Sequence, residues 1–205
     1  MLDGWIKVGQ GLFLSTGLGF GSGFLIMVLV YWAARRRVPA RARPRFRALQ
    51  ILSSAFMAFS HGSNDGQKFM GAFTLALVLG GELDAFVIPK WVIFLCAGVM
   101  AVGTITGGWR IMKTLGGRIT RLETHQGFSA EMAAAGTIEL ASRLGIPLST
   151  THTISTAIMG VGATRRLSAV RWGVTQELVT AWVLTFPICA GISWAVVRTM
   201  RMFLQ

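Results

Sequence analysis

Three long apolar stretches constrain the fold of this chain more than any other feature of its sequence. They cover residues 12–34, 91–109 and 172–197. A helix needs about 20 apolar residues to cross the hydrocarbon core of a bilayer. Only 14% of the 205 residues are charged, whereas a soluble domain carries about 25%. The sequence therefore predicts an all-α, polytopic membrane helix bundle and excludes a disordered chain or a soluble enzyme.

The basic residues flank the apolar stretches. The net charge is +12, and seven arginines lie between residues 35 and 47, directly after the first stretch. Further basic residues follow the second stretch, between Arg110 and Arg121. Lys and Arg in short loops beside membrane spans favour the cytoplasmic side. We therefore expect a multi-pass protein of the inner (plasma) membrane, with the lipid bilayer and not a nucleic acid as its partner.

The same pattern divides the chain into three parts. Residues 1–34 form a transmembrane helix, residues 35–47 a basic cytoplasmic linker, and residues 48–205 a larger domain. Within the last part, residues 127–144 and 149–162 are predicted to be two short helices, separated at Pro147 and flanked by arginines. Because neither helix has the length and apolar composition of a typical membrane span, a re-entrant helical hairpin is expected. Such backbone survives at membrane depth only where protein buries it or water reaches it.

A polar motif, Ser60–Lys68, interrupts the apolar segment between residues 48 and 80. We expect Gly62 and Gly66 to let the chain leave the helix, so that a restarting helix presents free N–H groups to an anion. Asp65 would supply negative charge for a cation or a proton, and Lys68 would neutralise either. The alternative is an ordinary cytoplasmic turn with Asp65 and Lys68 as a solvated pair.

A second polar motif begins after Pro147, which ends the preceding helix. Ser149 or Thr150 is a natural N-cap, so the next helix again points free N–H groups toward a ligand. The helical spacing then places four polar residues in one stripe: Ser149, His152, Thr153 and Thr156. The alternative is that these hydroxyl groups join neighbouring membrane helices.

Titratable residues near these motifs suggest a role for a second ion. Glu131 is the better candidate for binding a coupling cation or proton, whereas Glu139 and Glu177 are expected to pair with arginines. His61 and His152 are possible members of a proton relay, or structural histidines bonded to carbonyl groups. Neither Cys96 nor Cys189 has the spacing of a metal site, and both suit apolar surroundings.

Broken helices that point at an anion, with carboxylates for a coupling ion, are typical of secondary transporters. The motifs of this chain resemble the signatures of the inorganic phosphate transporter (PiT) family. The segments that carry the resemblance are 60–71 (SHGSNDGQKFMG), 127–131 (GFSAE), 147–152 (PLSTTH), 159–162 (MGVG) and 165–173 (RRLSAVRWG). Ser63 and Gly66 stand where the family often has Ala.

The resemblance implies two related halves of opposite orientation, each with one N-D segment and one S-T-T-H-like hairpin. This chain contains one of each, so it resembles the C-terminal half: residues 1–34 the last helix of the first half, and 48–205 the second-repeat transport domain. The implied function is symport of inorganic phosphate with protons or sodium by alternating access, without an organic cofactor or a metal site. The implied partner is a first-half chain or a second copy.

Two alternatives stay open. In the first, the chain is a non-transporting subunit, or an inactive truncated remnant, of a permease that needs a separate first-half chain. In the second, it is a membrane enzyme that handles phosphate. An enzyme is disfavoured because phosphoryl transfer usually uses paired carboxylates or a metal cluster. The resemblance and the motifs together assign phosphate binding to Asn64, Gln67, Lys68, Ser149, Thr150 and Thr151. Ion coupling is assigned to Asp65 and Glu131, with His61 and His152 as possible proton carriers.

Overall fold

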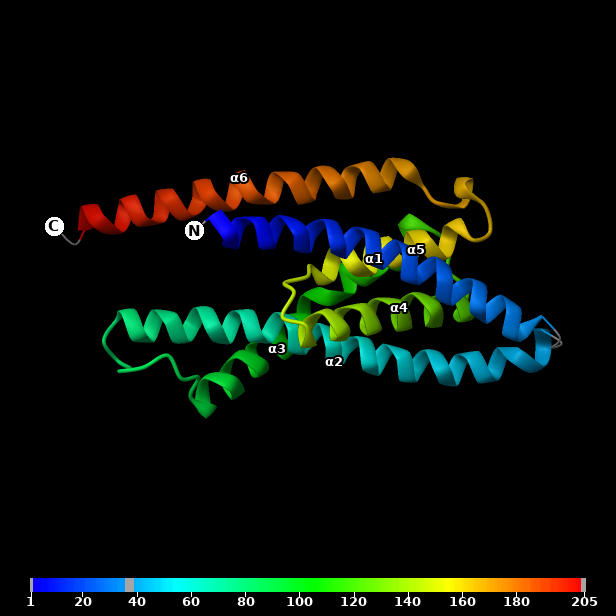
Figure 1. The fold of residues 1–205 in the computed structure, drawn as a ribbon, viewed down its shortest axis with the longest axis horizontal. Helices are drawn as coiled ribbons and strands as arrows, with labels where there is room; N and C mark the ends of the chain where they lie inside the picture. Colours follow the sequence, from blue (N-terminus) through cyan, green and yellow to red (C-terminus); the bar gives the residue numbers. More distant parts are fainter. Residues whose placement is uncertain (1, 36–38, 204–205) are drawn as a thin grey trace. The chain divides into compact units, whose positions relative to one another are not determined.

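A computed structural model describes residues 2–35 and 39–203, and throughout these ranges the regular structure is helical (Figure 1). The helices are α1 (Leu2–Ala34), α2 (Pro39–Leu79), α3 (Lys90–Thr114), α4 (Thr124–Arg143), α5 (Thr150–Ala163) and α6 (Trp172–Phe203), with a π-helical turn η1 (Leu115–Ile119) and a 3-10 turn η2 (Leu167–Ala169). The predicted all-α fold is confirmed. The chain divides into two compact units, Met1–Val170 and Arg171–Gln205, which are described separately.

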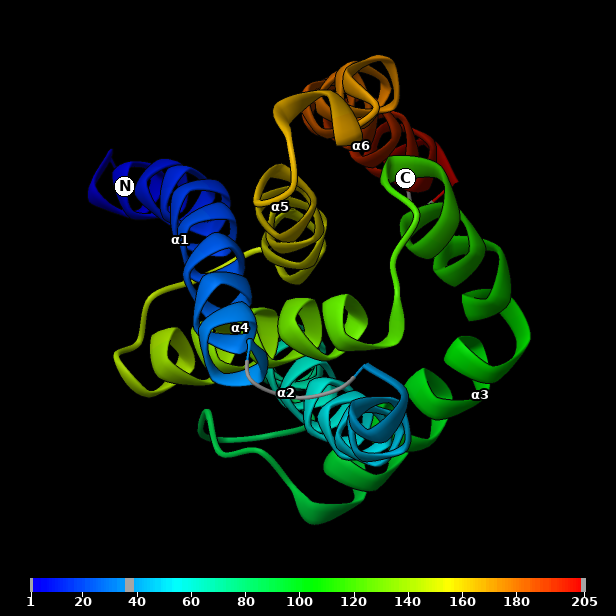
Figure 2. The ribbon, with the colours of Figure 1, turned by 90° about the vertical axis from the view of Figure 1, so that its right-hand side faces the viewer.

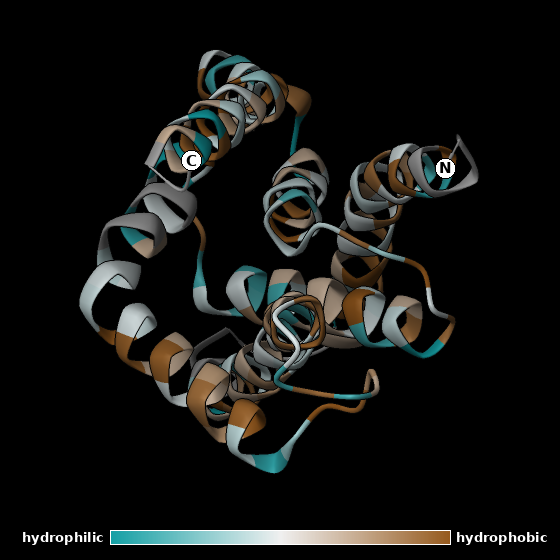
Figure 3. Cartoon of the chain, turned by 90° about the vertical axis from the view of Figure 1, so that its left-hand side faces the viewer, coloured by the Kyte–Doolittle hydropathy of each residue, from teal (hydrophilic) through white to brown (hydrophobic). Residues whose placement is uncertain are grey.

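Among the described residues, three helices are long and apolar enough to cross a bilayer. Their spans are Ile6–Ala34 in α1, Lys90–Trp109 in α3 and Trp172–Met202 in α6, and they contain the three apolar stretches from which a membrane protein was predicted. In the second unit, α6 is one continuous helix with Pro187 inside it. In the first unit, apolar residues run along α3, whose side chains are largely exposed (Figure 3).

The basic segment is more helical than expected. The sequence predicted a linker over residues 35–47, of which 36–38 lie outside the described residues. From Pro39 onward the segment belongs to α2, which also contains Pro44. Ala and Arg are among the strongest helix formers. Pro39 suits the first helical position, whereas Pro44 lies beyond the first turn and removes one N–H···O bond from the helix. The arginines between 41 and 47 therefore extend α2.

Helix α4 lies at the centre of the first unit, where it packs against α1, α2 and α5 (Figure 2). Helix α5 packs most extensively on α1, and α3 packs on α2. The buried centre is made of small residues, Ala133, Ala134 and Ala157, with Met57 and Ile154 packed against them. Small side chains let helices approach closely, which is how membrane helices gain packing energy.

Glycines produce the closest approach, between α1 and α5. A Cβ atom at Gly19 would collide with Thr156, one at Gly23 with Ala157, and one at Gly160 of α5 with the backbone of α1. Gly17 and Gly21 of α1 have the same G-x-x-x-G spacing as Gly19 and Gly23, but added Cβ atoms there would meet no neighbouring atom within 4 Å. One of the two overlapping spacings in the first span therefore serves the α1–α5 contact.

Gly160→Ala is expected to destabilise the first unit, because the added methyl group meets rigid backbone. Overpacking of this kind costs about 1–3 kcal/mol of unfolding free energy. Gly136→Ala is the matched control, since nothing lies within 4 Å of its Cβ position and Ala favours a helix over Gly by up to about 1 kcal/mol. Thermal unfolding in detergent measures the stability of the purified Gly160→Ala and Gly136→Ala variants. Equal stability of the two variants would contradict the close α1–α5 contact.

The start of α4 is attached to three other elements. Glu123 forms a capping box with Gln126 and an ion pair of 3.4 Å with Arg165, beyond the end of α5. The ring of His125 contacts Tyr31 of α1 and Phe46 of α2, each with ring centroids 5.9 Å apart. Burial lowers the pKa of His125, against the opposing charge of Glu123, so the imidazole is neutral at neutral pH. The beginning and end of the hairpin are thus held near each other.

The hairpin itself is built as the sequence predicted. Helix α4 ends at Arg143 with Leu144 as its C-cap. Gly145 adopts a φ of 68°, in the left-handed region that favours glycine after a helix. Pro147 follows, and α5 starts at Thr150 with Ser149 as N-cap. The two short helices pack on each other, so the predicted helical hairpin is confirmed.

Candidate functional site

The first polar motif lies within a continuous helix. Helix α2 runs unbroken from Pro39 to Leu79, so the predicted helix break between Ser60 and Lys68 is wrong. A Cβ at Gly62 meets no atom within 4 Å, and one at Gly66 meets only a flexible methionine end. Neither glycine makes a turn, and each costs the helix only about 1 kcal/mol relative to Ala. The motif therefore offers side chains, and not a helix N-terminus, to a ligand.

Asp65 is the centre of the polar contacts on α2. Its Oδ1 atom accepts hydrogen bonds from the Asn64 amide at 3.1 Å and the Lys68 ammonium at 3.2 Å. Its Oδ2 atom accepts one from the Thr150 hydroxyl at 3.0 Å and lies 3.6 Å from Nδ1 of His61. The bond to Thr150 joins the two polar motifs, which are 85 residues apart in the sequence.

The same face of α2 holds the tip of the hairpin. The Leu148 carbonyl accepts hydrogen bonds from the Lys68 ammonium at 2.9 Å and from the Asn64 amide at 3.5 Å. The amide oxygen of Asn64 accepts a further one from Ser142 at the end of α4. Asn64 is buried, whereas the Lys68 side chain is half exposed. These bonds place the N-terminus of α5 beside the motif on α2.

The first turn of α5 provides donors for an anion. Ser149 is the N-cap, as predicted, and its hydroxyl accepts from the His152 N–H at 3.4 Å. Its own N–H donates to the Ser15 hydroxyl of α1 at 2.9 Å. The N–H groups of Thr150 and Thr151 have no partner within a helix that begins at Thr150. Positive helix ends of this kind are ready-made anion sites.

The polar stripe along α5 has a different use. Thr153 and Thr156 are buried against α1, and Thr156 donates to carbonyl groups at 2.8 Å within α5 and at 3.4 Å to Ser15 of α1. These two hydroxyls therefore serve helix packing, the alternative considered for the motif. Only the first turn, at Thr150 and Thr151, remains available to a ligand.

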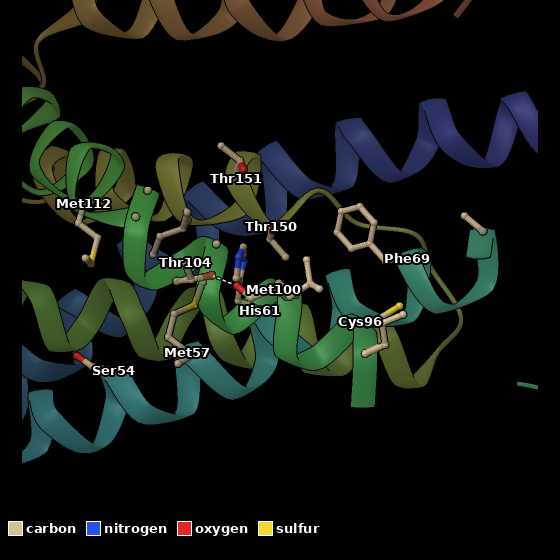
Figure 4. Close-up of a pocket in the computed structure, with 18 of the residues that line it drawn as sticks. Ser54, Met57, His61, Phe69, Cys96, Met100, Thr104, Met112, Thr150 and Thr151 are labelled. Atoms are coloured by element: carbon tan, nitrogen blue, oxygen red, sulfur yellow. Dashed lines mark hydrogen bonds between the residues drawn. The ribbon is translucent and has the colours of Figure 1, made fainter. Parts of the chain in front are cut away.

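A cavity of about 1190 Å³ opens next to this turn, between α2 and α3 (Figure 4). Its walls are mainly apolar and include Met57, Phe69, Phe73 and Met100. Its polar lining comes from Ser54 and His61 of α2, Thr104 of α3, Glu131 of α4, and Thr150 and Thr151 of α5. Figure 4 shows Thr150 and His61 in the middle of the cavity, with Ser54 to one side and Phe69 to the other. Hydroxyl donors and the Glu131 carboxylate thus line the same open cavity.

Glu131 is held by two serines that sequence reasoning missed. Its carboxylate accepts hydrogen bonds from Ser53 at 2.5 Å and Ser54 at 2.9 Å, both on α2. Ser54 and His61 are seven residues apart, a spacing that places both on one face of a helix. That spacing, inside an otherwise apolar segment, is the signal that could have identified Ser54. Among the described residues, no group of three or more His, Cys, Asp or Glu side chains is placed to hold a metal ion.

Residues 1–193 match the model of the phosphate transporter family. This chain belongs to that family. It is 45% identical over 192 residues to a probable low-affinity inorganic phosphate transporter of Rhizobium meliloti, and 40% identical over 190 residues to one of Bacillus subtilis. These matches cover 93% and 92% of the chain but 58% and 57% of the relatives. The chain therefore spans little more than half the length of these phosphate transporter relatives.

A solved structure has the same fold. The sodium-dependent phosphate transporter aligns with 88% of this chain and 54% of its own length, with a TM-score of 0.65 and 25% sequence identity. The relatives and this neighbour are named as transporters, so the family consists of transport proteins and not enzymes. Helices long enough to span a bilayer and membership of this family make the chain a membrane protein.

Two of the residues predicted for this phosphate transporter site lie apart from it. Gln67 is exposed on α2 and His152 is half-buried on α5, and neither lines the cavity. His61 does line it, beside Asp65. Glu139 pairs with Arg143 at 2.9 Å, as expected, and stays outside the cavity lining. Of the predicted residues, the cavity is lined by His61, Glu131, Thr150 and Thr151. Asn64, Asp65 and Lys68 lie outside its lining but are joined to it by hydrogen bonds to Thr150 and Leu148, with Ser149 as the N-cap.

Proposed function

We propose that this chain forms part of an inorganic phosphate transporter of the plasma membrane, which carries phosphate together with protons or sodium by alternating access. The observation that carries the proposal is the N-terminus of α5 at the cavity, where Thr150 and Thr151 lie beside Asp65. A transporter needs no covalent chemistry, only binding that differs between two conformations. Family membership supports phosphate as the transported anion.

Phosphate is proposed to bind at the first turn of α5, through the Thr151 hydroxyl, the free N–H groups of that turn, and the Thr150 hydroxyl once it releases Asp65. These donors suit a phosphate because each satisfies an oxygen lone pair without adding charge. Ser149 acts behind them as the cap. Asn64 and Lys68 hold the Leu148 carbonyl, so they would contact phosphate only after releasing it. Gln67 would reach phosphate only if α2 turned, because it is exposed away from the cavity.

The coupling ion is proposed to act at the two carboxylates of the site. Glu131 faces the cavity beside two serine hydroxyls, and Asp65 is bonded to the hydroxyl of a proposed phosphate ligand. Loading either carboxylate with a cation would change the charge that an incoming phosphate meets, which is the coupling that symport requires. His61, 3.6 Å from Asp65, is the proposed proton carrier.

The second candidate is a subunit that does not transport by itself. The observation in its favour is that the chain covers only 58% of the Rhizobium meliloti relative. Uptake of radiolabelled phosphate in a strain without other phosphate carriers tests both candidates. The chain is expressed alone, and also together with the part of that relative that it does not match. Saturable uptake only on co-expression supports the subunit; uptake in neither case, with both chains in the membrane, would contradict phosphate transport.

Changing Thr150 and Thr151 together to Val is expected to raise the half-saturating phosphate concentration at least about tenfold. Each lost hydrogen bond to a charged acceptor costs about 1.5–3 kcal/mol, and 1.4 kcal/mol is tenfold in affinity. The matched control is the double change of Thr180 and Thr185 to Val on α6, because their hydroxyls bond to carbonyls of their own helix and neither residue lines the cavity. An unchanged half-saturation in the first variant places the phosphate elsewhere.

A further inference from the structure

The ammonium group of Lys68 lies between two oxygen atoms that suit a metal cation. Its Nζ atom donates to Oδ1 of Asp65 at 3.2 Å and to the Leu148 carbonyl at 2.9 Å. In secondary transporters, backbone carbonyls at breaks between helices coordinate sodium. Leu148 lies in the break between α4 and α5, and the Asp65 carboxylate provides a second oxygen ligand. In this chain a covalently attached cation already occupies that position.

Three hydrogen bonds leave little room at the Asp65 carboxylate for a further cation. An ionised carboxylate offers about four acceptor sites. Asn64 and Lys68 use those of Oδ1, and Thr150 uses one of Oδ2, while the ring of His61 lies 3.6 Å from the same atom. A sodium ion at Asp65 would have to displace the ammonium group or lie beside it against like-charge repulsion. Both arrangements are unfavourable for sodium, because it must lose hydration water and compete with an ammonium group that is covalently held beside the carboxylate.

We propose that Lys68 is a built-in cation that takes the place of sodium at Asp65, and that it determines the ion specificity of the site. The inference rests on the proposed phosphate transport only where it concerns which ion is coupled to phosphate. The exclusion of sodium from Asp65 is a binding property of the chain and does not depend on transport. It leaves Glu131 as the carboxylate of the site that is open to sodium, so that the coupling role of Asp65 is limited to a proton. It also distinguishes Lys68 from the phosphate ligands, because two of its three donors are committed to protein oxygens.

The test is sodium-dependent stabilisation of the purified full chain in detergent. Lys68→Met keeps the apolar stem of the side chain and removes the ammonium group. An ion that binds only the folded protein raises its unfolding midpoint. In Lys68→Met, sodium chloride is expected to raise the midpoint by about 2 °C or more beyond its effect on the original chain. Choline chloride at equal concentration provides the ionic-strength reference, and Lys68→Ala repeats the measurement if Lys68→Met does not fold.

Three further variants localise the effect. Lys68→Arg keeps a cation and is expected to gain no sodium response. Lys90→Met removes the same charge from the exposed start of α3, and is also expected to gain none. Adding Asp65→Asn to Lys68→Met should remove the gain, because the carboxylate ligand is lost. A sodium response in Lys68→Met no larger than in the original chain, or one that survives Asp65→Asn, overturns the proposal.

Transport assays add an independent readout. In cells that take up phosphate through this chain, Lys68→Met should make uptake more dependent on external sodium than in the original protein. If no variant takes up phosphate but the sodium response of Lys68→Met behaves as described, the proposed function fails and the inference about Lys68 stands. If uptake is normal and the sodium response is absent, the inference fails and the function stands.

Discussion

Asp65→Asn is expected to abolish concentrative phosphate uptake while leaving membrane insertion intact. The substitution removes the charge that Lys68 and Thr150 share, and it turns one acceptor oxygen into a donor. Hydrogen bonds to a charged group are worth about 1.5–3 kcal/mol each, and the half-exposed Lys68 lies toward the lower end of that range. Losing two of these hydrogen bonds corresponds to at least about a hundredfold loss of phosphate uptake. Uptake of radiolabelled phosphate, normalised to the amount of chain in the membrane, measures it.

Asp84→Asn is the matched control for this change. Asp84 is exposed in the turn between α2 and α3, so the same chemical change there should leave uptake within about twofold, because exposed substitutions rarely exceed 0.5 kcal/mol. Concentrative uptake by Asp65→Asn at the level of the original protein removes Asp65 from the coupling role. Loss of the chain from the membrane in Asp65→Asn alone would instead make the Asp65–Thr150 bond a requirement for folding.

Glu131→Gln is expected to lower concentrative uptake at least about tenfold but to spare phosphate exchange across the membrane. The carboxylate accepts from Ser53 and Ser54, and an amide presents a donor to one of these hydroxyls, so a buried polar contact is lost at about 1–3 kcal/mol. A group that only couples an ion is needed for accumulation and not for exchange of bound phosphate. Uptake against a gradient and counterflow of labelled phosphate separate the two.

Glu139→Gln supplies the comparison on the same helix. Glu139 pairs with Arg143 four residues away, and the arginine is largely exposed. Surface pairs of this kind contribute about 0.3–0.5 kcal/mol, so uptake should change by less than about threefold. If Glu131→Gln accumulates phosphate as well as Glu139→Gln does, the coupling ion does not act at Glu131.

Local chemistry explains which features could be predicted from the sequence. The length of the apolar stretches sets the membrane spans, because only a helix satisfies its own backbone in hydrocarbon. Pro147 and Ser149 end one helix and cap the next through properties of their own residues, and the hairpin appears as predicted. The polar motif on α2 was correctly placed in the sequence as a candidate site, although its local structure was not.

The error at that motif shows the limit of local signals. Glycines and small polar residues permit a helix break but do not require one, and packing of α2 against α4 and α5 keeps the helix continuous. Which stripe of α5 faces a ligand was equally undetermined, since Thr150 and Thr153 have the same chemistry. Only the approach of α1, through its glycines, buries Thr153 and leaves Thr150 at the cavity.

The sequence by itself determined the fold class, the spans, the hairpin and the residue types of the site, because these depend on hydropathy, helix termini and charge within short segments. The tertiary structure alone decided that Asp65 meets Thr150, that Lys68 reaches the Leu148 carbonyl, and that Ser53 and Ser54 hold Glu131. Each of these contacts joins residues 77 to 85 positions apart. Such contacts depend on how the helices pack, which no local pattern encodes.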